Sequence, residues 1–413
     1  MSELAHLFLQ LLIVIGASRI VGKGFTRIGL PAVVGEMTTG ILLGPSLFGW
    51  LAPGAFAFVF PADSLTALRL LAQVGICLFM FAVGMEVNPQ QLRSSARTAV
   101  IVSQTSIVVP FLLGVGLAWF IVDDLAGPNA TFLGFALFMG ISMSITAFPV
   151  LARILQERGL SRTPLGTLAL TCAAINDVAA WAIMAFVVAI ARASSMSGAV
   201  LTLLLSAVFI AAMIWAVRPL VPRWLGADRL SREQPSSGTL ATVVCVAIAG
   251  ALCTELIGIH ALFGAFIAGA IMPDTEGFRE RVNTYVERFS AVLLLPLFFA
   301  FTGLRTQVGL LGDLQGWALC LLIVAVATAG KLGAAALAAR LAGWAWRESL
   351  ALGALMNTRG LVELIALNIG YDVDILSPRA FTMLVIMALA TTVLTGPLLT
   401  WLGQVRSLSG APR

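Results

Sequence analysis

Apolar residues in this chain gather in blocks of about 20, which are separated by short polar segments. A block of this length crosses a lipid bilayer as one helix. The pattern predicts about thirteen membrane-spanning helices, which take up most of the chain. Their expected ranges are 4–22, 31–48, 66–87, 99–122, 131–152, 164–191, 197–217, 238–257, 259–273, 289–304, 315–339, 348–370 and 380–403. The expected fold is therefore an all-α polytopic membrane protein.

Two of the predicted helices carry an interruption. The fifth contains MSITAFPVLARIL, where Pro149 removes a backbone donor, and the twelfth contains MNTRGLVELIALNIG, where amide, hydroxyl and glycine residues favour local unwinding. A packing kink would explain either segment alone. Because the two segments occupy corresponding places in two halves of six helices, we expect an inverted repeat with an ion site between the halves, as in secondary transporters.

Basic residues fall mainly in every second loop, starting after the first helix, and the loops between are mostly acidic or neutral. The basic loops hold Lys23, Arg27, Arg93, Arg97, Arg153, Arg158, Arg162, Arg218, Arg223, Arg229, Arg232, Arg279, Arg281, Arg288, Arg340, Arg347, Arg406 and Arg413. Cytoplasmic loops are enriched in Lys and Arg. We therefore expect the N-terminus outside and the C-terminus in the cytoplasm.

The composition supports a single integral membrane domain over residues 1–413, since 59% of the 413 residues are hydrophobic and only 11% are charged. The N-terminal segment lacks a basic leader and a cleavage site, so it is expected to remain as the first helix. The five cysteines lie in apolar runs, which argues against disulfides and a metal cluster. The net charge of +5 is scattered over the loops, so we expect no nucleic-acid partner.

Several ionisable residues nevertheless fall inside predicted spans, where charges usually pair or line a transport path. They are Glu36, Asp177, Glu255, Lys331, Arg359 and Glu363, with His260 near a span end. Glu363 follows Arg359 by four residues, so an intrahelical ion pair is its expected role. Glu36 and Glu255 are candidate pathway carboxylates. A packing role suits Glu36 equally well, and a solvated loop residue is the simpler interpretation of His260.

Asp177 is the candidate binding group for a monovalent metal cation. A carboxylate with hydroxyl neighbours offers the oxygen ligands that hard cations prefer, and Ser142, Ser144, Thr146 and Thr171 are expected to supply the hydroxyls. Burial penalises the ionised carboxylate, so a proton competes with the cation for the same group. A divalent ion would require more carboxylates than this region holds.

Asn176 precedes Asp177, so this pair of neighbours carries one negative charge where two adjacent carboxylates would carry two. Exchange of one H⁺ for one K⁺ or Na⁺ at such a site moves no net charge. Alternatively, Asp177 only pins helices together by pairing with Lys331 or Arg359. Arg359 suits either the cancellation of the Asp177 charge or the balancing of the interrupted helix.

These residues favour a secondary active antiporter that works by alternating access, and neither an enzyme nor a protein with a bound cofactor. A gated monovalent cation channel on the same scaffold is the main alternative. A symporter of organic anions is a third hypothesis, which Lys331 and Arg359 keep open.

The chain also resembles the monovalent cation:proton antiporter superfamily. Within it, the nearest branch contains bacterial glutathione-gated potassium efflux transporters and plant cation/proton exchangers. The motifs that carry this resemblance are GLPAVVGEMTTGILLGPSLFG, GICLFMFAVGMEVNPQQLR, SITAFPVLARILQERGL, AAINDVAAW, GIHALFGAFIAGAIMP and GALMNTRGLVELIALNIG. The resemblance implies thirteen spans with two crossed discontinuous helices, divided into interleaved dimerisation and ion-carrying subdomains. It also implies a homodimer in the bacterial inner membrane that serves pH homeostasis.

The resemblance places the family's essential aspartate at Asp177 and its basic partner at Lys331. Asn176 stands where the gated efflux members have Gln, which argues against channel-like efflux. The chain ends at Arg413 without a nucleotide-binding regulatory domain, so gating by such a domain is not expected.

Overall fold

The computed structural model describes residues 2–28, 30–86, 97–161, 163–192, 196–226, 234–274 and 277–403. Helices make up the regular structure of these ranges, which contain no strand and one isolated β-bridge, between Ala126 and Leu376. A helix satisfies its own backbone donors and acceptors, which is what an apolar segment needs inside hydrocarbon. Six of the loop arginines that carry the orientation prediction lie outside the described residues. They are Arg93, Arg162, Arg229, Arg232, Arg406 and Arg413.

Eleven helical segments of the described chain are long and apolar enough to cross a bilayer, and one bent pair of helices makes a twelfth candidate. The predicted ninth span corresponds to α15, Ala261–Ala270, which has only 10 residues. The predicted tenth span is longer than expected, because the charged helix α16 continues through a π-helical turn into α17. The chain is thus a multi-pass membrane protein, and thirteen is an approximate count.

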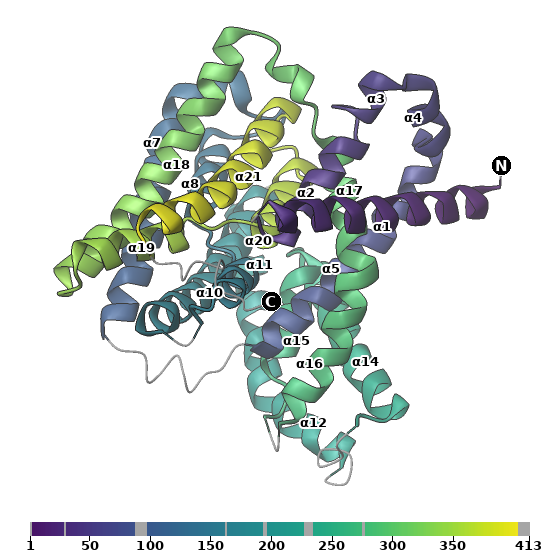
Figure 1. Ribbon diagram of the computed structural model, residues 1–413. Coiled ribbons are helices and arrows are strands. Elements are labelled where there is room, and N and C mark those ends of the chain that lie inside the picture. The colour runs from purple at the N-terminus through teal and green to yellow at the C-terminus, as the bar shows by residue number, and fades with distance from the viewer. Residues whose placement is uncertain are drawn as a thin grey trace, which may run out of the picture. The chain divides into compact units, whose positions relative to one another are not determined.

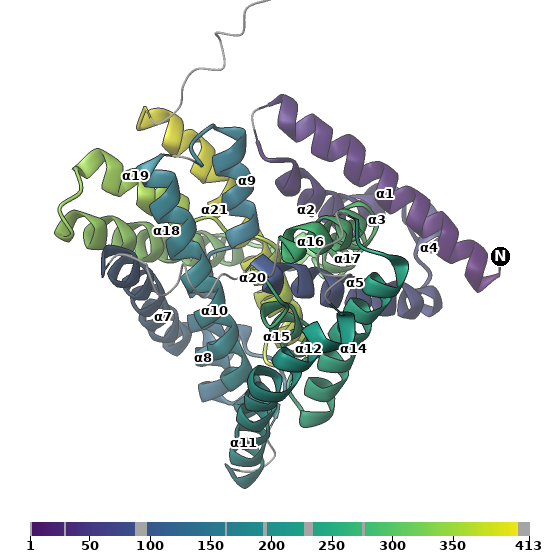
Figure 2. The ribbon, with the colours of Figure 1, turned by 90° about the horizontal axis from the view of Figure 1, so that it is seen from below.

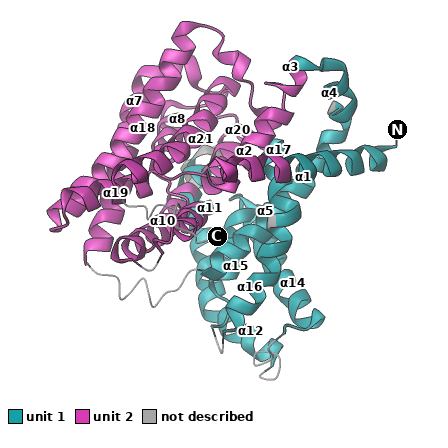
Figure 3. Cartoon of the chain, in the orientation of Figure 1, with its two compact units in different colours: residues 1–17, 51–89, 185–301 teal, residues 18–50, 90–184, 302–413 magenta. Residues whose placement is uncertain are grey.

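The chain divides into two compact units that alternate along the sequence (Figure 3). Unit 1 consists of residues 1–17, 51–89 and 185–301, and unit 2 consists of residues 18–50, 90–184 and 302–413. Four helices have residues in both units, namely α1 Glu3–Arg27, α3 Phe48–Leu51, α10 Pro164–Arg192 and α17 Leu295–Arg305.

Unit 1 is built around α15, which packs against α5 and α14 (Figures 1 and 2). Its further elements are α4 Pro53–Val59, α5 Leu65–Glu86, α11 Met196–Ala212, α12 Arg218–Leu225, α14 Ser237–Ile257 and α16 Phe278–Phe289, with π-helical turns at Met213–Val217 and Ser290–Leu294 and a 3₁₀ turn at Ala62–Ser64.

Unit 2 contains two sets of three helices with the same order, in which an interrupted helix stands between two continuous ones. The first set is α7 Arg97–Leu125, the pair α8 Phe132–Ser144 and α9 Phe148–Glu157, and the start of α10. The second set is α18 Leu314–Leu341, the pair α19 Trp346–Met356 and α20 Leu361–Asp372, and α21 Pro378–Trp401. Unit 2 also holds α2 Ala32–Leu43, most of the short α3 Phe48–Leu51 and a 3₁₀ turn at Val308–Leu311.

The interruptions lie where helix-breaking residues occur in the sequence. Residues 145–147 are extended, and Pro149 stands in the first turn of α9, where its missing N–H costs nothing. The second interruption covers residues 357–360, and α19 and α20 meet there at an angle of 44°. The hydroxyl of Thr358 donates to the carbonyl of Leu355 at 2.6 Å, which gives the backbone a non-helical alternative at this point.

Candidate functional site

The two interruptions of unit 2 are joined directly by hydrogen bonds. The backbone N–H of Ala147 donates to the carbonyl of Thr358 at 3.1 Å. The hydroxyl of Thr146 donates to the carbonyl of Met356 at 2.9 Å. Backbone groups that are buried away from water need hydrogen-bond partners. Here the α8–α9 interruption supplies donors to two carbonyls at the α19–α20 interruption.

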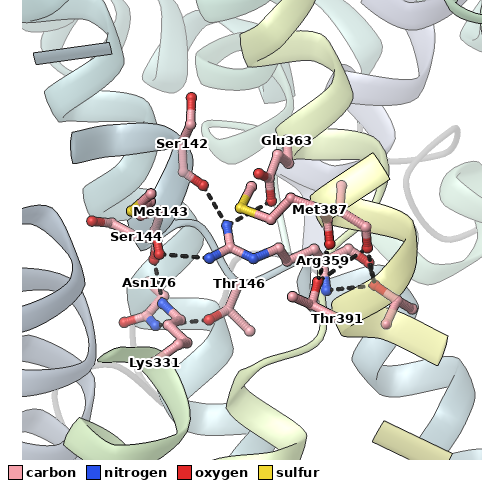
Figure 4. A network of polar contacts seen from close by, with 12 residues as sticks. Ser142, Met143, Ser144, Thr146, Asn176, Lys331, Arg359, Glu363, Met387 and Thr391 are labelled. Carbon is pink, nitrogen blue, oxygen red and sulfur yellow. Dashed lines mark hydrogen bonds and ion pairs between the residues drawn. The ribbon is translucent and has the colours of Figure 1, made fainter. Parts of the chain in front are cut away.

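The C-terminal end of α8 is neutralised by two buried cations. Of its last four carbonyls, that of Ile141 accepts the N–H of Ile145, and the other three have no partner within the helix. Arg359 donates to the carbonyls of Ser142 and Met143, the latter at 2.7 Å, and Lys331 donates to the carbonyl of Ser144 (Figure 4). Because a helix C-terminus carries a partial negative charge, these cations stabilise the break.

The C-terminal end of α19 is satisfied differently. Its last carbonyls accept hydrogen bonds from backbone N–H groups and from three hydroxyls, which belong to Thr146, Thr358 and Thr395. All of these donors are neutral. Because these hydroxyl and backbone N–H donors carry no formal charge, they leave the partial negative charge of this helix end in place, and it favours a cation nearby.

Asn176 is fully buried in α10 and connects three elements. Its amide nitrogen donates to the hydroxyls of Ser106 at 3.0 Å and Thr146 at 3.2 Å, and its amide oxygen accepts from Ser103 at 2.5 Å. Ser103 and Ser106 lie on α7, and Thr146 lies in the α8–α9 interruption. The hydrogen bonds of Asn176 thus hold this part of α10, including the neighbouring Asp177, in position against α7 and the α8–α9 interruption.

Asp177 is buried on α10, with 3% of its surface exposed. Lys331, which is fully buried on α18, lies within Coulombic range of Asp177, Arg359 and Glu363. A buried carboxylate is tolerated when opposite charges and polar groups surround it. Asp177 therefore belongs to the same electrostatic network as the two cations.

Arg359 and Glu363 form an ion pair at 2.8 Å with both side chains fully buried (Figure 4). The expected pair is present, but its expected geometry was wrong, because Arg359 lies in the interruption and α20 begins only at Leu361. Arg359 is instead held by α21, where Thr392 accepts from its backbone N–H at 2.9 Å and donates to its carbonyl at 2.8 Å. The bonds from the Arg359 guanidinium to the carbonyls at the end of α8 favour the helix-balancing role for this residue.

The predicted hydroxyls are placed unequally. Thr146 contacts Asn176, whereas Ser144 donates to the carbonyls of Ile107 and Gly140, and Thr171 donates to Thr167 of its own helix. The Ser142 hydroxyl is buried and has no hydrogen-bond partner within the described residues.

The two candidate pathway carboxylates make other contacts. Glu36 is buried on α2, and one of its oxygens lies 3.8 Å from Arg19. Glu255 is in unit 1, where its carboxylate accepts from the N–H of Ala261 at 2.9 Å. His260 is the N-cap of α15, and its Nδ1 accepts from the N–H of Leu262 at 3.5 Å. The solvated-loop interpretation of His260 therefore missed its capping role.

Several residues around the site were not predicted from the sequence, among them Ser103, Ser106 and Thr392. Ser103 and Ser106 are three positions apart on α7, and Pro110 follows Ser106 by four. Hydroxyls with helical spacing ahead of a proline were a usable signal, since they share one face and the proline frees a carbonyl on it. Thr392 had no such signal, because its partner Arg359 is 33 residues away.

Comparisons with known proteins place this arrangement in context. The profile of a family described as "Sodium/hydrogen exchanger, transmembrane" matches residues 11–405. The chain is 44% identical over 390 residues to the Na(+)/H(+) antiporter NhaS4 of Synechocystis sp., and the match covers 94% of this chain and 95% of that protein.

Other relatives are longer than this chain. Cation/H(+) antiporter 17 of Arabidopsis thaliana is 39% identical over 95% of the chain and 48% of its own length. K(+)/H(+) antiporter 1 of Saccharomyces cerevisiae is 31% identical over 96% of the chain and 46% of its own length. The chain spans about half of these two relatives.

Among solved structures, the sodium proton antiporter MjNhaP1 of Methanocaldococcus jannaschii superposes with a TM-score of 0.70. The match covers 98% of both chains, and the two sequences are 15% identical. The chain therefore shares the fold of that protein.

Proposed function

Because this chain belongs to the sodium/hydrogen exchanger family of the monovalent cation:proton antiporter superfamily, we propose that it exchanges K⁺ or Na⁺ for H⁺ across a membrane. Asp177 is the group that binds either the cation or the proton, and alternating access exposes it to one side at a time. The observation that carries the proposal is the burial of Asp177 within the polar network of the two interruptions.

The charges of this network support a stoichiometry of one to one. Lys331 and Arg359 balance Asp177 and Glu363 when all four are ionised. Either H⁺ or an alkali cation on Asp177 then adds the same single charge, so exchange of one for the other is electroneutral. Asn176 contributes no further charge, and its amide is already hydrogen-bonded to three hydroxyls.

The surroundings of Asp177 also suit a small cation. The α19 end is capped by neutral hydroxyls and carries a partial negative charge. Thr146 and the unpartnered hydroxyl of Ser142 are the proposed oxygen ligands beside Asp177, with Ser144 contributing through its hydroxyl lone pairs.

The alternative functions fit less well. Relatives across most of the chain are named antiporters, which argues against the gated channel. An organic-anion symporter would need free cationic groups for its substrate. Here Lys331 and Arg359 donate to helix carbonyls and to Glu363.

The two units suggest a division of labour. Asp177, Lys331 and Arg359 all lie in unit 2, which we assign as the ion-carrying core. Unit 1 is assigned to dimerisation in a homodimer. The protein would reside in the bacterial inner membrane with its C-terminus in the cytoplasm, as the loop arginines indicate.

Transport in proteoliposomes tests the proposal. An imposed pH gradient should drive Na⁺ or K⁺ uptake against the cation's own gradient, at a rate that does not change with membrane potential. Asp177→Asn should abolish uptake while the purified protein stays folded and monodisperse. Uptake that only runs downhill would identify a channel, and exchange retained by Asp177→Asn would place the site elsewhere.

A further inference from the structure

A proline lies inside α7 next to the ion-binding network. Pro110 has no backbone N–H, so the carbonyl four residues earlier, that of Ser106, cannot receive its helical hydrogen bond. The pyrrolidine ring also pushes this carbonyl away from the helix axis. A buried carbonyl without its helical partner needs another donor.

Lys331 supplies that donor. Its ammonium nitrogen donates to the Ser106 carbonyl at 2.9 Å and also to the Ser144 carbonyl at the end of α8. The Ser106 carbonyl is available to Lys331 because Pro110 cannot donate to it, and the Ser144 carbonyl is available because α8 ends at that residue. An ammonium group has three hydrogens, so two of them are committed to α7 and α8.

The packing of α18 on α7 maintains this contact. Gly330 precedes Lys331, and a Cβ at this glycine would lie 3.5 Å from Pro110 and 2.7 Å from a methyl carbon of Leu113. Only glycine allows α18 to approach α7 so closely without displacing Leu113. The proline and the glycine together bring the lysine to the freed carbonyl.

Several charged or titratable groups act on Lys331 from the elements around it. Asp177 and Cys172 come from α10, Arg359 comes from the α19–α20 interruption, and Glu363 comes from α20. Asp177 and Glu363 are the carboxylates in this group, and Glu363 is ion-paired to Arg359. If the Lys331 ammonium lost one of its two carbonyl acceptors, Asp177 would therefore be the carboxylate that attracts it.

We propose that Pro110 is a positioning residue for exchange: by freeing the Ser106 carbonyl it anchors the Lys331 ammonium and limits its ion pair with Asp177. The carboxylate then remains available to an alkali cation. This inference rests on the proposed exchange at Asp177. It explains why a proline stands within the continuous helix α7, one turn from the serine that also contacts Asn176.

The test is to restore the missing N–H. In Pro110→Ala the Ser106 carbonyl regains a helical partner, and Lys331 shifts toward Asp177. The apparent KM for Na⁺ or K⁺ should then rise about tenfold, which corresponds to about 1.4 kcal/mol, with the maximal rate within about twofold of wild type. Pro110→Gly restores the same N–H and should behave alike, so it replaces Pro110→Ala if that variant does not fold.

Pro397→Ala is the matched control, because Pro397 also lies inside a membrane helix, α21. The carbonyl that it frees belongs to Val393, whereas Lys331 and Arg359 donate to carbonyls of α7 and α8 and to Glu363. This variant should leave the apparent KM unchanged. An equal rise in KM for both prolines would show that helix geometry alone is responsible and would overturn the proposal.

A double-mutant cycle separates positioning from packing. Binding of ²²Na⁺ or ⁸⁶Rb⁺ to purified protein is measured for wild type, Pro110→Ala, Lys331→Gln and the double variant. Pro110→Ala should weaken binding about tenfold with Lys331 present and have no effect in the Lys331→Gln background.

The same loss of binding in both backgrounds, or an unchanged KM in an actively exchanging Pro110→Ala, would refute the role of Pro110. The absence of exchange in wild type would refute the proposed function instead.

Discussion

Replacing Arg359 by glutamine tests how strongly the interrupted helices depend on one buried cation. The guanidinium is fully buried, pairs with Glu363 at 2.8 Å and donates to two carbonyls at the end of α8. Breaking a buried ion pair on one side costs about 3–5 kcal/mol, because the remaining charge stays in the protein interior. Each carbonyl left without a donor adds about 1–3 kcal/mol.

Glutamine can recover one of these carbonyls, so Arg359→Gln should lose at least about 4 kcal/mol of stability. Glu363→Gln should lose about 3 kcal/mol, the lower end of the range for breaking a buried pair, because Arg359 keeps its carbonyl acceptors and gains a neutral amide. The double variant leaves neither charge unpaired. It should be at least about 2 kcal/mol more stable than the sum of the two single changes predicts.

The assay is thermal unfolding of the three variants and wild type in one detergent at one scan rate, since unfolding of such proteins is commonly irreversible. The apparent Tm should fall most for Arg359→Gln and recover in the double variant. If the two changes add, or if Arg359→Gln is as mild as Glu363→Gln, the pair does not carry the stability assigned to it.

Two further changes probe other parts of unit 2. Asn176→Asp replaces the amide that donates to Ser106 and Thr146 and adds a titrating charge, so exchange should become dependent on membrane potential; rates that stay independent of an imposed potential would contradict the charge count. Gly303→Ala should lower the apparent Tm by an amount equivalent to about 1–3 kcal/mol, because its Cβ would lie 1.8 Å from the backbone of Gly40. Gly309→Ala, where a Cβ meets open space, is the control, and equal loss in both would rule out close packing as the cause.

The spans were predictable because membrane insertion depends on local hydropathy. Hydropathy predicted the ends of a span less accurately where charged and apolar residues alternate. α16, with the sequence FRERVNTYVERF, is helical but polar, so the tenth span was expected to begin eleven residues too late, at 289 instead of 278. The ninth span was expected over 259–273, whereas a left-handed Gly258 and the His260 cap delay α15 to Ala261.

The interruptions were also predictable, since proline, glycine and hydroxyl residues act on their own backbone. The partners of the buried charges were not. Arg359 and Glu363 pair as their spacing suggested, but through an extended segment and not along one helix. The choice between two roles for Arg359 depended on where the end of α8 lies, and that is a property of the folded unit.

The amino-acid sequence by itself therefore determined the membrane class, the approximate spans, the two breaks and the few residues that carry charge at depth. These follow from interactions within about one helical turn. Only the tertiary structure decided that Lys331 bonds to carbonyls 187 and 225 residues away and that Arg359 reaches α8 across 216 residues. The acceptors are backbone oxygens, which every residue has, and only the folding of α7 and α8 makes these few available.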